Sequence, residues 1–221
     1  MKEPGFKVYL VDDDPAVLKG LGRLLRAGRY DAVTFNSAQE FMQAYQRDAP
    51  GCLVLDISMP GLTGLELQRW LTQKDCLIPV IFLTGRGDIP TSVRAMKEGA
   101  VDFLTKPVND ADLLQAVEEA SRRERQLRAA RAEAGALQAR LAHLTPRERE
   151  VLEHVVSGKL NKQIAAELGT VEKTIKVHRA RVMEKMGVES LAALARLAER
   201  AGIGRPHPAG GPSPANLPPP G

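Results

Sequence analysis

The sequence predicts two folded domains: an α/β domain on a doubly wound parallel sheet, then a helical linker and an all-α domain. At 221 residues the chain is long for one ordinary domain but sufficient for two that each bury a core. The first half alternates short aliphatic runs with amphipathic stretches, whereas the second half is helical in its periodicity. The first 120 residues carry 13 Lys and Arg against 17 Asp and Glu, and the remainder carry 18 against 10. This change of sign favours an acidic module joined to a basic, nucleic-acid-binding one.

Five strand–helix repeats are expected in the first half. The predicted strands are at 7–11, 32–35, 53–56, 80–84 and 101–105. The predicted helices are at 17–26, 38–47, 64–73, 89–98 and from 110 onward. Such an alternation is typical of a parallel sheet with helices on both faces, in which ligands bind at the carboxyl ends of the strands.

Composition excludes several classes of protein. Apolar residues make up 43% of the chain and charged residues 26%, the averages of soluble globular domains. The chain has no apolar run of membrane-spanning length, and its first residues lack the apolar core of a signal peptide. We therefore expect a cytoplasmic protein without a membrane partner. Cys52 and Cys76 show no metal-ligand spacing and are expected to stay reduced.

A long helix is expected between the two domains. From 111 to about 144 the pattern is helical, with apolar residues at alternating steps of three and four: Leu127, Ala130, Ala134, Leu137, Leu141 and Leu144. Because this seam is short and rich in alanine, a helical linker over 123–142 is favoured over a coiled coil, with a dimer contact as the alternative. Residues 204–221 are rich in Pro and Gly, and we expect a disordered tail there.

Acidic residues and one lysine are predicted to meet at the carboxyl edge of the sheet. Asp12 and Asp13 follow the first strand, and Asp56 ends the third. Thr84 ends the fourth strand and Lys106 follows the fifth. In a doubly wound sheet these strand ends adjoin one another. Carboxylates can hold Mg²⁺ and a lysine adds a balancing positive charge, so the set suits phosphoryl transfer.

Each residue of this set has an expected role. Aspartate becomes an effective nucleophile when Mg²⁺ and a lysine neutralise the incoming phosphoryl group, so we expect Asp56 to attack phosphorus. Thr84 and Lys106 would hold phosphoryl oxygens. The metal ligands expected beside Asp56 are Asp13, which binds directly, Asp12, which acts through water, and the backbone carbonyl of Ser58. Any single Asp could merely cap a helix or turn, but the whole set is not expected by chance.

These motifs resemble the receiver domains of two-component response regulators. The matching segments are Val11-Asp12-Asp13-Asp14, Asp56-Ile57-Ser58-Met59-Pro60-Gly61, Thr84-Gly85 and Lys106-Pro107. The resemblance places a receiver at 5–122 and implies phosphotransfer from a sensor histidine kinase onto Asp56, dependence on Mg²⁺, and a cis peptide before Pro107. It also implies that Thr84 and Phe103 shift together on phosphorylation, and that receivers dimerise, here near 91–101.

Four helical patterns follow, at 146–157, 162–168, 171–185 and 190–200. The second and third, with the turn at Gly169, form a helix-turn-helix at about 161–180 whose later helix should enter the major groove of DNA. Along that helix Ile175, Val182 and Met186 can face the core, leaving a largely basic surface. A basic helix face alone is usually just solvated, so the turn and the charge of the domain carry the argument for DNA.

This region resembles LuxR-type DNA-binding domains, here placed at 143–203. The matching segments are 144–152, 161–165 and 174–179, which read LTPREREVL, NKQIA and TIKVHR. With the receiver, the chain resembles the FixJ-like branch of the FixJ/NarL regulators, which implies that Lys176 and Val177 meet the bases. The expected DNA contacts are Asn161, Lys162, Lys173, Thr174, Lys176, Val177, His178, Arg179 and Arg181. The family often has Ser where Val171 stands, and Val171 cannot cap. Either Thr170 caps instead and the helix starts about one residue early, or the start is uncapped at a cost of about 1 kcal/mol.

The expected function is a phosphorylation-controlled transcription regulator, not an enzyme. Phosphorylation of Asp56 would favour a homodimer that binds promoter DNA, with activation through RNA polymerase as the expected output. One alternative is a DNA-binding regulator that ignores phosphorylation and uses its receiver only as an interaction module. The other is a haloacid-dehalogenase-like phosphatase, but Ser58 stands where that class has its second Asp.

Overall fold

A computed structural model describes residues 5–47, 49–85 and 99–203, which form two compact units divided between Ala130 and Arg131. The helix predicted at 89–98 and the Pro-rich tail at 204–221 lie outside the described residues. Across the described part of the chain, no helix combines the length and the apolar character needed to cross a membrane.

The first unit contains a parallel sheet of five strands in the order β2-β1-β3-β4-β5. The strands are β1 (Lys7–Val11), β2 (Asp31–Phe35), β3 (Gly51–Asp56), β4 (Val80–Thr84) and β5 (Asp102–Thr105). Every residue of β3 and β4 is buried, as expected for continuous aliphatic runs covered on both faces. The predicted doubly wound α/β fold is confirmed.

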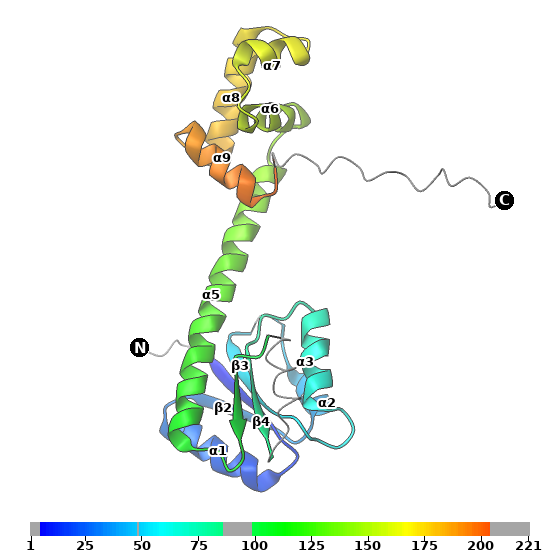
Figure 1. The fold of residues 1–221 in the computed structure, drawn as a ribbon, viewed down its shortest axis with the longest axis vertical. Helices are drawn as coiled ribbons and strands as arrows, with labels where there is room; N and C mark the ends of the chain where they lie inside the picture. Colours follow the sequence, from blue (N-terminus) through cyan, green and yellow to red (C-terminus); the bar gives the residue numbers. More distant parts are fainter. Residues whose placement is uncertain (1–4, 48, 86–98, 204–221) are drawn as a thin grey trace, which may run out of the picture. The chain divides into compact units, whose positions relative to one another are not determined.

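Helices cover both faces of this sheet (Figure 1). Between α2 (Ala38–Ala44), α3 (Gly64–Gln73) and the sheet lies one apolar cluster, which includes Phe41, Leu67 and Phe82. The other face packs against α1 (Pro15–Ala27) and the beginning of α5 (Asp110–Ala142), where Leu25 and Leu113 are fully buried. In the described part of this unit the sheet is therefore the middle layer of three.

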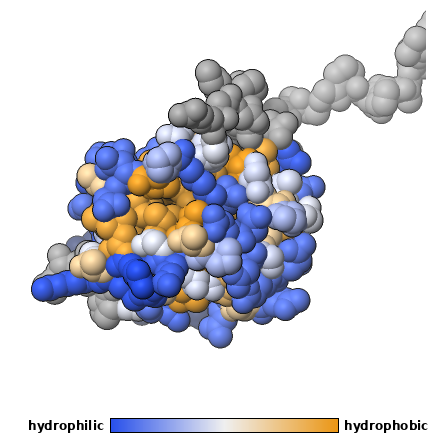
Figure 2. Space-filling model, turned by 90° about the horizontal axis from the view of Figure 1, so that it is seen from below, coloured by the Kyte–Doolittle hydropathy of each residue, from blue (hydrophilic) through white to orange (hydrophobic). Residues whose placement is uncertain are grey.

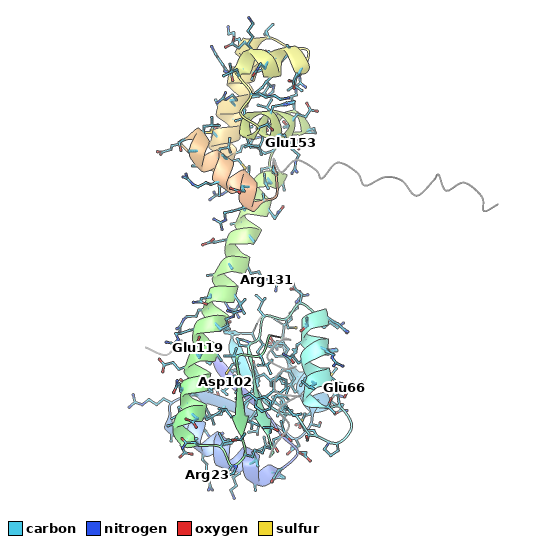
Figure 3. All side chains as sticks on the ribbon, viewed as in Figure 1. Arg23, Glu66, Asp102, Glu119, Arg131 and Glu153 are labelled. Atoms are coloured by element: carbon cyan, nitrogen blue, oxygen red, sulfur yellow. The ribbon has the colours of Figure 1, made fainter. Side chains whose placement is uncertain are left out.

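Side-chain caps fix where the helices of this unit begin. The Asp14 carboxylate accepts from the Ala16 amide at 2.8 Å, and the Ser37 hydroxyl accepts from the Glu40 amide at 3.2 Å. At α3, Thr63 and Glu66 form a reciprocal capping box, and Figure 3 shows Glu66 in the first turn of that helix. Each cap satisfies an amide that has no partner within its own helix.

The second unit consists of the end of α5 with α6 (Pro146–Val156), α7 (Asn161–Glu167), α8 (Glu172–Met186) and α9 (Leu191–Arg200). Its apolar core contains Ile175, Val182 and Met186 of α8, so this prediction is confirmed. The core also contains Leu137 and Leu141 of α5, which the sequence assigns to the linker.

The two helices of the helix-turn-helix begin without a side-chain cap. Val171 is the N-cap of α8 and makes no capping bond, and the helix begins at Glu172. Of the two alternatives for this start, the structure therefore matches the uncapped one and not a cap by Thr170 one residue early. At its other end α8 stops at Gly187, whose φ of 64° lies in the left-handed region that glycine tolerates best.

A buried carboxylate joins α6 to the end of α8. Glu148, 2% exposed, accepts from the Thr145 amide at 2.9 Å and from Lys185 Nζ at 2.6 Å. Lys185 also donates to the carbonyl of His143 at 3.1 Å. These bonds, with Lys185 as the largest cause, lower the pKa of Glu148 from 4.5 to about 2. The capping box of α6 thus also fixes the last turn of α8.

Replacing this carboxylate is expected to destabilise the second unit. Glu148→Gln keeps the size of the side chain but leaves Lys185 with a weaker partner, so we expect roughly 1–3 kcal/mol less stability at neutral pH. Because the folded pKa is lowered, the contribution is complete above the ordinary pKa of 4.5 and is lost as the pH falls toward about 2. Hydrogen exchange of peptides from 145–200, measured in the full chain, gives the local unfolding free energy.

The matched control is Glu150→Gln on the same helix, since Glu150 is half exposed and pairs only with Arg147 among the ion pairs recorded for the described residues. Surface pairs of this kind contribute little. Equal destabilisation by the two substitutions would contradict the role given to Glu148.

Candidate functional site

Three carboxylates meet at the carboxyl edge of the sheet. Asp12 directly follows β1 and Asp56 ends β3, and the pairing of Val11 with Leu55 places these two residues side by side. Asp12 is 1% exposed and Asp56 is 4% exposed, whereas Asp13 is open to solvent. One oxygen from each of the three lies within 4.8 Å of the others. The structure therefore brings together the predicted acidic residues in an oxygen-only donor set that fits a hard divalent cation.

Lys106 reaches the buried pair from the end of β5. Its Nζ lies 2.6 Å from Oδ2 of Asp12 and 3.2 Å from Oδ1 of Asp56. Burial acts to lower the pKa of this lysine, but the bonds to the two carboxylates outweigh it, and the pKa is raised. The peptide between Lys106 and Pro107 is cis, as the resemblance to receivers implies. The lysine thus supplies a fixed positive charge against two buried negative ones.

The Asp56 carboxyl group lies in a buried position that disfavours its ionised form. Burial raises its pKa, and the neighbouring Lys106 and a bond from the Ser58 amide only partly oppose this effect. A further positive charge at the acidic cluster would favour the ionised carboxylate, the form in which an aspartate can act as a nucleophile.

A glycine lets the chain turn tightly behind Asp56. A side-chain carbon at Gly64, the first residue of α3, would lie 2.3 Å from the carbonyl oxygen of Asp56. Real Cβ atoms do not approach an oxygen so closely, so α3 can begin against the end of β3 only with glycine at this position. Figure 2 looks onto this end of the strands, where hydrophilic residues border a group of hydrophobic ones.

The two predicted switch residues lie on neighbouring strands. Thr84 ends β4, is 7% exposed, and its hydroxyl donates to the carbonyl of Gly85 at 2.9 Å. Phe103 pairs with Phe82 across β4 and β5, is half-buried, and packs against the apolar cluster beneath α2 and α3. Most of the predicted dimer surface at 91–101 lies outside the described residues.

In the second unit, α8 presents a basic outer face. The predicted contact residues with exposed side chains are Lys162, Lys173, Lys176, Val177 and Arg181. Val177 is 46% exposed, which is unusual for a large apolar side chain and leaves it free to contact a partner. The other predicted contact residues, Asn161, Thr174, His178 and Arg179, are half-buried.

One contact between the two helices was not expected from the sequence. Nη1 of Arg179 on α8 donates to Oδ1 of Asn161, the first residue of α7, at 2.6 Å. Eighteen residues separate the pair in the chain, so no local spacing rule could have identified it. Both residues were predicted to contact DNA independently, and the structure shows them bonded to each other.

Comparison with known protein families matches both units. The model described as response regulator receiver domain matches residues 8–118, and the model described as bacterial regulatory proteins, luxR family, matches residues 142–198. A receiver implies a histidine kinase as partner, and a luxR-family domain implies DNA binding.

Several known proteins are similar along most of their length. Nodulation protein W of Bradyrhizobium diazoefficiens is 46% identical over 200 residues, covering 90% of this chain and 88% of that protein. Transcriptional regulatory protein FixJ of the same organism is 42% identical over 196 residues, covering 89% and 96%. The solved structure of response regulator StyR has a TM-score of 0.80 and 44% identity, covering 89% of this chain and all of that one. The chain therefore belongs to the FixJ-like two-component response regulators, which are DNA-binding transcription regulators rather than enzymes.

Proposed function

We propose that phosphorylation of Asp56 by a sensor histidine kinase controls DNA binding by the second unit. The observation that carries this proposal is the cluster of Asp12, Asp13 and Asp56 around Lys106 at one edge of the sheet. Two buried carboxylates beside each other are costly unless a cation compensates them, and one lysine leaves the cluster with net negative charge. A receiver used only as an interaction module would have no need of this arrangement.

The transfer uses groups that the site already holds. A carboxylate oxygen of Asp56 forms the new bond to phosphorus, while the bond from phosphorus to the imidazole nitrogen of the kinase breaks and the freed imidazole takes up a proton. Mg²⁺, held by Asp13, Asp56 and the Ser58 carbonyl, with Asp12 acting through water, would neutralise the phosphoryl oxygens. Lys106 is close enough to Asp56 to pair with one of these oxygens.

Phosphorylation of Asp56 would offer the Thr84 hydroxyl a stronger hydrogen-bond acceptor than its present one. Its hydroxyl is bonded to the neutral carbonyl of Gly85, and an anionic phosphoryl oxygen would be a stronger acceptor. We propose that this change moves Thr84 toward Asp56 and lets the half-buried Phe103 turn further into the sheet. The movement would favour a homodimer of receivers.

The DNA-binding half of the proposal rests on α8. Its exposed Lys173, Lys176 and Arg181 would meet phosphates and base edges, and Val177 would pack against a base. A dimer would present two such helices to two half-sites on promoter DNA in the cytoplasm, with activation through RNA polymerase as the proposed output. In this scheme residues 5–122 are the receiver, 123–142 link the domains, and 143–203 bind DNA.

Replacing the phosphorylated residue is expected to remove the switch. With Mg²⁺ and acetyl phosphate, the wild-type protein should dimerise and bind promoter DNA at least about tenfold more tightly, a coupling of ordinary size for an allosteric protein. Asp56→Asn should do neither, because the amide cannot accept the phosphoryl group. Sedimentation and fluorescence anisotropy, with and without phosphodonor, measure both effects.

The matched control is Asp14→Asn, which changes an exposed aspartate next to the acidic cluster while keeping its helix cap. It should respond to acetyl phosphate as the wild type does. Tight DNA binding by Asp56→Asn and by wild type alike, whatever the phosphodonor, would support the phosphorylation-independent alternative instead.

Contacts to phosphates and to bases are expected to differ in their salt dependence. Lys173→Ala removes an exposed charge from α8 and should reduce the slope of log affinity against log salt concentration by about 1. Val177→Ala should leave the slope unchanged and alter base preference at one position, measured by selection from random duplexes. The control for total charge is Lys19→Ala, at an exposed position on α1. If Lys19→Ala lowers the salt slope as much as Lys173→Ala does, α8 is not the contacting surface.

A further inference from the structure

Arg179 is a held cation of the second unit whose partner is neutral, as are Arg140 and Arg149, which bond the carbonyls of Met186 and Leu141. Other held cations of this unit have carboxylate partners. Lys185 is paired with Glu148, Lys159 with Glu167, and Arg147 with Glu150. In each case a carboxylate neutralises the cation. Arg179 is instead bonded through Nη1 to the amide oxygen of Asn161, at 2.6 Å. An amide can orient a guanidinium, but it carries no charge to cancel.

The position of Arg179 on α8 shows where its free N–H groups can act. It lies four residues after the buried Ile175 and three after the exposed Lys176, so it is a neighbour of both on the helix surface. Arg179 is accordingly half-buried, at the border between the core face and the outer face. From the flank of a helix lying in the major groove, the groups within reach are the phosphates along the edge of the groove rather than the bases.

Asn161 does not use its side chain in the usual way for an asparagine at a helix start. Such residues commonly bond an amide of their own helix. In α7 the N-cap is Leu160, and its amide is satisfied by the side chain of Gln163 at 2.8 Å. The oxygen of Asn161 is directed across to α8 instead.

From these contacts we infer that Asn161 is a positioning residue, which holds Arg179 in the orientation that binds a DNA phosphate and leaves its positive charge available. The inference deepens the proposed function, because it takes α8 as the recognition helix. An arginine held before binding loses less conformational freedom on the DNA than a free one. Asn161 then contributes to affinity without a DNA contact of its own.

A double-mutant cycle in the full chain tests this inference, with fluorescence anisotropy on mixed-sequence duplex DNA at several salt concentrations. Arg179→Ala should reduce the salt slope by about 1, as the loss of one phosphate contact does. Asn161→Ala should weaken binding about 3- to 10-fold, the cost of ordering one long side chain, with the slope kept. Combined with Arg179→Ala, it should weaken binding no further.

Asn161→Asp separates positioning from a purely structural role. The carboxylate keeps the bond to Arg179 and suits the N-terminus of α7, so the melting temperature should not fall. Because it also neutralises the guanidinium, DNA affinity and salt slope should both decrease. Gln163→Glu is the matched control: it adds the same charge to the first turn of α7 and keeps the bond to the Leu160 amide. Its effect should be the same in the Arg179→Ala background, where that of Asn161→Asp should shrink to the size of the Gln163→Glu effect.

Two results would overturn the inference. One is a loss of affinity on Asn161→Ala that is equally large without Arg179, since this would mean that Asn161 touches DNA itself. The other is unchanged affinity for Asn161→Ala or Asn161→Asp. Lys176→Ala distinguishes these outcomes from failure of the proposed function: if Lys176→Ala and Arg179→Ala both leave binding unchanged, α8 is not the recognition helix.

Discussion

Repulsion between buried carboxylates is the constraint on which the first unit depends. Asp12 and Asp56 are almost fully buried side by side, because β1 and β3 are adjacent strands in the middle of the sheet. Lys106 can reach both only because β5 ends at the same edge. The strand order, the tight turn at Gly64 and the cap at Asp14 all place backbone around this cluster. The fold thus maintains a site that is incompletely neutralised and favours an added cation.

The two units differ in the partners that neutralise their charged side chains. In the first, negative charge that one lysine does not balance is buried at the carboxyl edge of the sheet, in a donor set that fits a divalent cation. In the second, some cations that hold helices together are matched by carboxylates, as Lys185 is by Glu148, and others, such as Arg140, bond backbone carbonyls. On the outer face of α8, Lys176 is exposed and lies 3.4 Å from Glu172, and Arg179 is held by a neutral amide. A cation held by a neutral amide keeps its full charge for a ligand such as a DNA phosphate.

The sequence was sufficient to predict the parts of the protein that follow from local periodicity. Aliphatic runs predicted all five strands, and the strand ends predicted which acidic residues would meet, because parallel strands end at one edge. Contacts between residues far apart in the chain, and the acceptor that a side chain chooses, were not predictable from the sequence. The bond between Asn161 and Arg179 joins two helices. The bond from the Thr84 hydroxyl to the carbonyl of Gly85 depends on the conformation of that side chain. The sequence left open whether Thr170 caps α8, and the structure shows an uncapped start with Val171 as the N-cap.

The burial of the apolar seam that begins in α5 favours one of its two interpretations. A coiled coil requires a continuous stripe over several heptads that is free to meet a second chain. Three members of the seam, Leu137, Leu141 and Leu144, are buried in the core of the second unit with α6 and α8. Ala130 and Ala134 are exposed but too small to form a stable seam alone. Pairing through this helix would require the second unit to give up part of its core, so the proposed dimer is better assigned to the receiver.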